Sequence, residues 1–200
     1  MLDVAGALCL LVLSAPVMIV AAALIRLTSR GPAIYSQTRV GQQGREFALL
    51  KLRTMVAGAE RRTGPVMAAR GDSRITAVGR YLRPFHLDEL PQLFNVLAGQ
   101  MSLIGPRPER PHFVRIFRRR VPGYDLRLAV KPGITGLAQV RGSYSTMPER
   151  KLRFDLAYIG NYSLGLDVEI FLRTIPTVVR PGRADRYAQS PAWQPANGGD

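Results

Sequence analysis

The stretch from residue 4 to residue 25, VAGALCLLVLSAPVMIVAAALI, decides to which class this protein belongs. It contains no charged residue, and a helix needs about 20 apolar residues to cross the hydrocarbon core of a bilayer. A cleaved signal peptide fits poorly, because no basic segment precedes the run and the run is too long. Arg26, Arg30 and Arg39 follow it, so the positive-inside rule predicts that the rest of the chain is cytoplasmic.

Pro16 lies near the middle of this apolar segment, where its ring removes an amide donor and clashes with the carbonyl four residues back. The sequence therefore predicts a kink at this position. Two arrangements remain open: a kinked helix that spans the bilayer, and a re-entrant helix-break-helix that enters one leaflet and returns. In the second arrangement both ends are cytoplasmic. Ser14 could bond a preceding carbonyl at the break.

The composition points to an anionic partner. The chain has 200 residues and a formal net charge of +14, which suits nucleic acid, anionic lipid or a phosphorylated substrate. The only cysteine, Cys9, lies in the apolar segment, so no internal disulfide can form. The only histidines, His86 and His112, have no cysteine neighbours, which argues against a zinc site.

The body of the chain is predicted to be a mostly helical α/β domain with a small hairpin. Two extended stretches within residues 33–55 flank a turn at Gly41–Gly44. A polar loop over 56–75 precedes a helical pattern over 74–99 that ends at Gly99. Further along, the patterns predict a basic helix that ends at Pro122-Gly123, a type II turn at Pro132-Gly133, and two more helices before residue 180. We expect a membrane segment over 1–30, a catalytic domain over 31–180 and a disordered tail over 181–200.

Asp88 and Glu89 begin the segment LDELPQLFNVLAG, residues 87–99. One interpretation is helix capping, because Asp is a preferred N-cap residue and Pro91 is tolerated in a first helical turn. The other interpretation is chemical. A helix N-terminus binds phosphate, and a carboxylate that is ionised at its ordinary pKa can act as a nucleophile without a general base.

An anionic nucleophile that attacks a diphosphate needs cations nearby. Mg²⁺ held by one or two carboxylates and by the substrate's phosphates would meet this need. Arg107 lies between Pro106 and Pro108 on a stiff loop, with little conformational entropy to lose on binding. The candidates for neutralising the phosphates are Lys51, Arg53, Arg83 and Arg107.

Several blocks of this sequence together resemble the bacterial sugar transferase family, the monotopic phosphoglycosyl transferases that begin glycan assembly on undecaprenyl phosphate. The blocks are the kinked apolar N-terminus, GQQGREFALLKLRTM, RPFHLDELPQLFNVLAGQMSLIGPRP and KPGITGLAQV. The likeness extends over about residues 1–180. The stretches GPRPERP and RGSYSTMPERKLRFDLAYI look more like the hexose-1-phosphate transferases of exopolysaccharide, O-antigen and capsule synthesis than the di-N-acetylbacillosamine branch.

The resemblance implies a Mg²⁺-dependent transfer of a sugar 1-phosphate from a UDP-sugar to undecaprenyl phosphate. By matching positions, Asp88 would be the nucleophile that forms a covalent phosphosugar intermediate and releases UMP. Glu89 would assist through the metal, so that both carboxylates hold it, and Arg83, Arg107 and a basic residue at Lys51 or Arg53 would contact phosphates. The resemblance also favours the re-entrant arrangement.

The implied setting is the cytoplasmic face of the bacterial inner membrane, with interfacial amphipathic helices on anionic lipids. Basic residues such as Arg118, Arg119 and Arg120 could rest on the headgroups. The sequence leaves open whether the protein forms a homodimer. It departs from the family in two ways. Ala15 replaces the serine that commonly precedes the proline of the break, and no further domain precedes the apolar segment, so we expect a minimal form or a piece of a longer protein.

Two competing functions are considered. A non-enzymatic module could use the charge to bind a membrane surface or nucleic acid, but the basic residues lack the interleaved aromatic residues that stack on bases. We therefore expect no nucleic-acid partner. A phosphohydrolase could use the same site with water as the acceptor.

Overall fold

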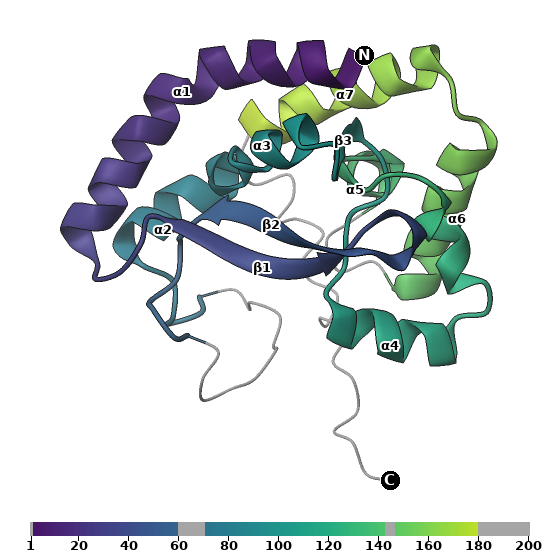
Figure 1. The fold of residues 1–200 in the computed structure, drawn as a ribbon, viewed down its shortest axis with the longest axis horizontal. Coiled ribbons are helices and arrows are strands. Elements are labelled where there is room, and N and C mark those ends of the chain that lie inside the picture. Colours follow the sequence, from purple (N-terminus) through teal and green to yellow (C-terminus); the bar gives the residue numbers. More distant parts are fainter. Residues whose placement is uncertain (1, 60–70, 143–146, 180–200) are drawn as a thin grey trace, which may run out of the picture.

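The computed structural model describes residues 2–59, 71–142 and 147–179. Within them, helices predominate and two small sheets complete the fold (Figure 1). The predicted tail over 181–200 lies outside the described residues, as does much of the predicted loop over 56–75.

The apolar N-terminal segment forms one helix, α1 (Leu2–Thr28), which continues through Pro16 and bends near its middle (Figure 1). Ser14 Oγ donates to the carbonyl of Leu11 at 3.4 Å, as expected at the break. The helix buries small side chains such as Ala7 and Ala21 against the body. Ile25 is also buried, but larger apolar side chains such as Val12, Leu13 and Ile19 are exposed, which is the distribution expected of a helix that contacts lipid. By length and hydropathy it is able to cross a membrane.

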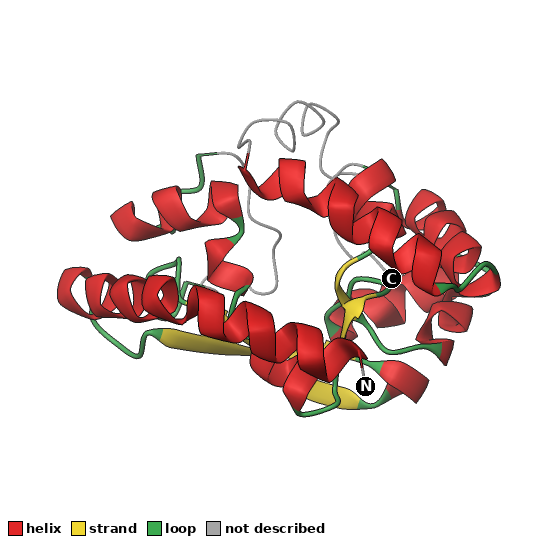
Figure 2. Ribbon diagram, turned by 90° about the horizontal axis from the view of Figure 1, so that it is seen from above, coloured by secondary structure: helices red, strands yellow, loops and turns green. Residues whose placement is uncertain are grey.

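The predicted hairpin is confirmed. Strand β1 (Ile34–Val40) pairs antiparallel with β2 (Glu46–Leu52), with Ile34 opposite Leu52 and Val40 opposite Glu46, around the turn η1 (Gln42–Gly44). The hairpin strands lie along the same side of the molecule as α1 (Figure 2). One apolar cluster joins these parts: Ala7 of α1, Leu49 of β2, and Leu93, Val96 and Met101 from the segment that follows the acidic pair.

The helical pattern predicted over 74–99 is confirmed in part, because the chain divides into short helical segments here. The chain forms α2 (Ala77–Leu82), the 3₁₀ turns η2 (Arg83–Phe85) and η3 (Leu87–Glu89), and the short helix α3 (Gln92–Leu97). His86 separates the two 3₁₀ turns with a left-handed φ of 55°, so the chain changes direction there. The predicted stop is confirmed, because Gly99 has a φ of 74° that favours glycine.

The predicted type II turn at Pro132-Gly133 is also wrong. Gly133 belongs to β4 (Gly133–Thr135), which pairs in parallel with β3 (Ser102–Ile104), and its φ is outside the left-handed region that a type II turn requires. The glycine serves close packing instead. A Cβ atom at Gly133 would lie 2.1 Å from the backbone nitrogen of Gly105.

The remaining helices follow the predicted patterns. The basic helix α4 (Pro111–Arg120) ends before Pro122-Gly123, where Gly123 has a φ of 74°. The turn η4 (Tyr124–Ala129) then leads to β4 and the short helix α5 (Leu137–Arg141). The two expected C-terminal helices are α6 (Pro148–Gly160) and α7 (Leu164–Val179). In Figure 1, the N-terminal half of α1 and α7 both lie at the top of the molecule, whereas α4 lies at the bottom; the view from above in Figure 2 shows that α1 and α7 are separated from each other.

Candidate active site

Asp88 and Glu89 lie in η3, between the left-handed residue His86 and the start of α3. Both carboxylates are buried, at 9% and 8% exposure. The capping interpretation is wrong: α3 begins at Gln92 after the N-cap residue Pro91, and no side chain caps it. The adjacent acids therefore need another explanation for their burial.

Glu89 is held by two cations from distant parts of the chain. Lys51 Nζ, at the end of β2, lies 2.7 Å from Glu89 Oε1. Arg107 donates from Nη1 to Glu89 Oε2 at 3.1 Å and from Nη2 to Glu89 Oε1, so the contact is bidentate. Burial alone would raise the pKa of Glu89, but the charges of Arg107 and Lys51 outweigh it and hold the pKa well below its usual range.

Asp88 has the opposite electrostatic environment. Burial and the neighbouring Glu89 carboxylate raise its pKa, although Lys51, Arg83 and His86 act against them. The pKa of Asp88 is thus raised above the ordinary value from which the sequence analysis argued. Two adjacent carboxylates whose pKa values are pushed apart are typical of a catalytic pair with different roles.

The other predicted phosphate-binding residues fall into two groups. Arg83 is in η2, lines the same cavity as Asp88 and lowers the pKa of Asp88 by its charge. Arg53 also lines this cavity, but it is bonded to the end of α1 and not to the acidic pair. Its guanidinium donates to the carbonyl of Ser29 at 3.0 Å, to Ser29 Oγ at 2.9 Å and to the carbonyl of Arg30. Of the two alternatives, Lys51 is the residue that the structure brings to Glu89.

A cavity of about 1910 Å³ extends from the acidic pair to α1. The charged side chains of Lys51, Asp88, Glu89 and Arg107 line it. Apolar side chains of α1 and α7 line it as well, among them Leu10, Leu13, Val17 and Phe171. Such a cavity can hold a charged group beside the acidic pair and a hydrocarbon chain beside α1.

The donor set at the acidic pair fits Mg²⁺ only in part. Among the described residues, no group of three or more His, Cys, Asp or Glu side chains could hold a metal ion. Proteins nevertheless commonly bind Mg²⁺ through only one or two carboxylates, while substrate phosphates and water complete the coordination of the ion. Asp88 and Glu89 would supply the protein ligands.

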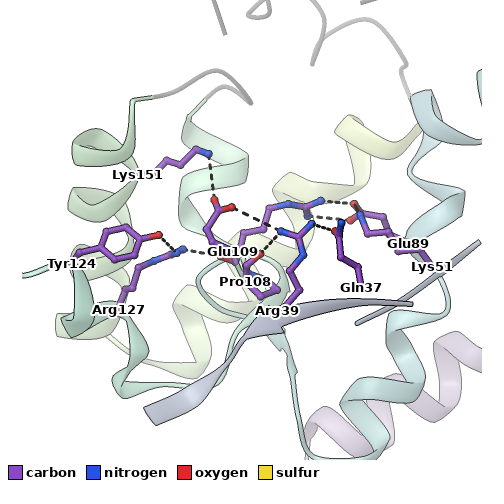
Figure 3. A network of polar contacts seen from close by, with 10 residues as sticks. Gln37, Arg39, Lys51, Glu89, Pro108, Glu109, Tyr124, Arg127 and Lys151 are labelled. Carbon is purple, nitrogen blue, oxygen red and sulfur yellow. Dashed lines mark hydrogen bonds and ion pairs between the residues drawn. The ribbon is translucent and has the colours of Figure 1, made fainter. Parts of the chain in front are cut away.

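A second polar network, which sequence reasoning missed, adjoins the pair (Figure 3). Glu109 lies 3.6 Å from Lys151 Nζ and 3.9 Å from Arg39 Nη1. Arg127 Nε donates to Asp155 Oδ2 at 2.8 Å, and this ion pair is buried, with side-chain exposures of 5% and 2%. Arg127 lies in η4 and Asp155 in α6, and no local sequence pattern indicates that these two side chains form an ion pair.

The comparisons with known proteins agree with one another. A family model described as bacterial sugar transferase matches residues 1–181. The chain is 45% identical over 190 residues to a UDP-glucose:undecaprenyl-phosphate glucose-1-phosphate transferase of Caulobacter vibrioides, covering 92% of this chain and 70% of that protein.

Two other relatives are longer than this chain. A UDP-N-acetylgalactosamine-undecaprenyl-phosphate N-acetylgalactosaminephosphotransferase of Aeromonas hydrophila is 44% identical over 181 residues, covering 89% of this chain and 43% of its own length. A UDP-glucose:undecaprenyl-phosphate glucose-1-phosphate transferase of Klebsiella pneumoniae is 42% identical over 171 residues, and the match covers 83% of this chain and 37% of that protein. The chain thus spans less than half the length of these two.

Proposed function

Because this chain belongs to the bacterial sugar transferase family, we propose that it transfers a sugar 1-phosphate from a UDP-sugar to undecaprenyl phosphate. The names of its relatives supply these two substrates. One observation carries the proposal. The raised-pKa carboxylate of Asp88 lines the cavity next to Glu89, which gathers Lys51 and Arg107 at the same place.

In the first step, an oxygen of the Asp88 carboxylate attacks the phosphorus that carries the sugar. The bond between this phosphorus and the bridging oxygen of the diphosphate breaks, and UMP leaves with the electron pair. Asp88 is then an acyl phosphate ester of the sugar. A carboxylate with a raised pKa is more basic than an ordinary aspartate, and so a stronger nucleophile once ionised.

In the second step, a phosphate oxygen of undecaprenyl phosphate attacks the same phosphorus. The bond from this phosphorus to Asp88 breaks, the carboxylate is restored, and the product is an undecaprenyl diphosphate sugar. The apolar side chains that line the cavity, such as Leu10, Leu13 and Phe171, would contact the first part of the prenyl chain. No general base is needed in either step, because both nucleophiles are anions.

Lys51 and Arg107 would exchange partners during the reaction. Both cations are paired with Glu89 in this structure, and both can turn to the phosphate oxygens of a bound substrate. Mg²⁺ on Asp88 and Glu89 would neutralise charge on the diphosphate. It would also compensate Glu89 after the two cations have moved.

The re-entrant arrangement is supported by the two ends of α1. A straight helix of 27 residues is about 40 Å long, so a spanning helix would carry one end across the bilayer. Here Asp3 Oδ1 accepts hydrogen bonds from Ser102 Oγ and from the backbone nitrogen of Leu103, both at 2.9 Å. Arg53 holds the other end. Both ends are thus bound to one body, which we place on the cytoplasmic face of the inner membrane.

The expected contact of Arg118, Arg119 and Arg120 with lipid headgroups does not fit this arrangement. These residues belong to α4, on the opposite side of the molecule from the N-terminal half of α1 and from α7 (Figure 1). The anionic headgroups would instead meet basic residues beside the membrane helix, such as Arg26 and Arg30.

The proposal is tested by incubating the protein with a panel of UDP-sugars, undecaprenyl phosphate and Mg²⁺ and measuring UMP release. We expect turnover with at least one UDP-sugar, and a loss of about 10⁴-fold or more in the Asp88→Asn variant. Without acceptor, the wild type should accumulate an adduct of sugar-phosphate mass on the peptide that contains Asp88. An adduct on another residue would refute the assignment of the nucleophile.

The same assay separates the alternative functions. Steady release of sugar phosphate without undecaprenyl phosphate would indicate a phosphohydrolase. Salt-dependent binding to DNA, together with no release of UMP from any UDP-sugar, would indicate a binding module. Omission of Mg²⁺, with EDTA added, should abolish turnover by the wild type.

A further inference from the structure

The loop that carries Arg107 is held in an unusual way. Residues 106–109 offer four consecutive backbone carbonyls, and each accepts a hydrogen bond from another part of the chain. The donors are Gly133 N to Pro106 O at 3.0 Å, Arg127 Nη2 to Arg107 O at 2.8 Å, Arg39 Nη1 to Pro108 O at 3.1 Å, and Val40 N to Glu109 O at 2.9 Å.

The prolines explain why the loop is held through its carbonyls. Pro106 and Pro108 have no N–H group, so half of the residues between 106 and 109 cannot donate to a neighbouring strand. Donors from other segments therefore fix the loop at its carbonyls. Two of these donors are backbone amides of β1 and β4, whereas the other two are guanidinium groups (Figure 3).

Arg127 is itself fixed on all three of its nitrogens. Nε donates to Asp155 of α6, Nη1 donates to Tyr124 Oη at 2.8 Å, and Nη2 reaches the carbonyl of Arg107. A buried ion pair is costly to desolvate and is often no more stabilising than an apolar pair of the same volume. The planar fork of arginine does, however, supply directed donors that no apolar side chain could supply.

Arg39 holds the other side of the loop. It donates from Nη1 to the carbonyl of Pro108 and from Nη2 to Gln37 Oε1 at 2.7 Å, and it lies 3.9 Å from Glu109. The peptide units on either side of Pro108 are therefore pinned from β1 and from η4 at once. Between these anchors the side chain of Arg107 leaves the loop and donates to Glu89.

We propose that Arg127 and Arg39 are positioning residues. They hold the backbone of the 106–109 loop so that the guanidinium of Arg107 stays aimed at Glu89 and, when a UDP-sugar is bound, at its phosphates. The part of this inference that concerns the phosphates rests on the proposed function, whereas the part that concerns Glu89 does not. A misplacement of about 1 Å in such a group can cost about 10²-fold in rate.

The test is a double-mutant cycle. In the wild-type background, Arg39→Gln and Arg127→Lys should each lower kcat by about 10- to 100-fold with a smaller change in the KM for UDP-sugar. In an Arg107→Ala background, each should cause less than about a twofold further loss, because the group they position is gone. Arg118→Gln is the control: it removes an exposed ion pair of an arginine on α4 and should leave kcat unchanged.

Losses that multiply in the Arg107→Ala background would overturn the inference, because they would show that Arg39 and Arg127 act independently of Arg107. If Arg127→Lys does not fold, which its thermal unfolding would show, Arg39→Gln decides alone. Its side chain is 17% exposed, so the replacement is tolerated more easily.

Amide hydrogen exchange gives a readout that does not need activity. Arg39→Gln should speed exchange of the amides of Val40 and Gly133, which donate to the carbonyls of this loop, by about tenfold or more, while the amides of α3 and α7 stay as in the wild type. Unchanged exchange of these two amides would overturn the inference even if turnover falls. If the wild type turns over no UDP-sugar, the proposed function fails, and hydrogen exchange still decides whether the two arginines hold the loop.

Discussion

Replacing Glu89 by Gln should destabilise the protein, although the two side chains have nearly the same shape. The carboxylate accepts a contact of 2.7 Å from Lys51 and a bidentate contact from Arg107. Removing its charge leaves two cations facing each other in a cavity. Breaking a buried ion pair costs about 3–5 kcal/mol. Because Lys51 and Arg107 keep 18% and 27% exposure, we expect about 2–3 kcal/mol here.

The assay is thermal unfolding in detergent, followed by intrinsic fluorescence. For a domain of this size a loss of about 2–3 kcal/mol corresponds to a fall in Tm of about 4–12 °C. The control is Glu46→Gln, which removes an exposed carboxylate of β2 and should change Tm by less than about 2 °C.

The pH dependence of this loss has a definite sign. The folded-state pKa of Glu89 is depressed, so its contribution to stability is present above the unfolded pKa of about 4.3 and is lost as the pH falls toward the folded value. The difference in Tm between wild type and Glu89→Gln should therefore be largest near neutral pH and shrink below about pH 4. A variant as stable as the wild type at neutral pH would refute the idea that Glu89 is the counter-ion of both cations.

Three further predictions use other parts of the structure. Asp88→Asn should leave Tm at pH 7 unchanged or raise it, because burial raises the pKa of Asp88 and the ionised form of this side chain therefore costs stability. For the same reason, turnover of the wild type should fall on acidification at a pH above about 3.9, which is the ordinary pKa of aspartate. Asp3→Asn should lower the free energy of unfolding by about 1–2 kcal/mol, seen in Tm, because it weakens the tether of α1 to β3; an unchanged Tm would mean that the tether is not used. Gly133→Ala should reduce the yield of folded protein, because its Cβ would lie 2.1 Å from the nitrogen of Gly105, whereas Gly160→Ala meets nothing within 4 Å and should fold normally, as size-exclusion chromatography can check.

The hairpin and the helices after residue 110 could be predicted because their signals are local. Alternation, glycine turns and prolines act within a few residues of one another, and they indicate the same elements in the structure. The pattern over 74–99 did not reveal the division into short helices, because helical spacing does not report a change of direction. His86 adopts a left-handed φ between two 3₁₀ turns, and the apolar residues at helical spacing pack into different clusters on either side: Leu87 packs against the cluster of Leu82, and Leu97 against the cluster of Leu49.

The candidate site was found in part for the same reason. Asp88 and Glu89 are adjacent in the sequence, and Arg107 is marked by its two prolines. The choice between Lys51 and Arg53 needed the structure. Strand β2 ends at Leu52, so the chain leaves the sheet there and Arg53 turns to the end of α1, whereas Lys51 remains beside Glu89.

The sequence by itself determined the uncharged apolar segment and the net positive charge, which predict contact with a membrane and with anions, because hydropathy and charge are sums over residues and do not depend on how the chain folds. Only the tertiary structure decided that the two acids have opposite electrostatic environments, and that Arg39 and Arg127 hold the loop of Arg107. A pKa depends on burial and on charges within a few ångströms, and these neighbours come from segments that are tens of residues apart.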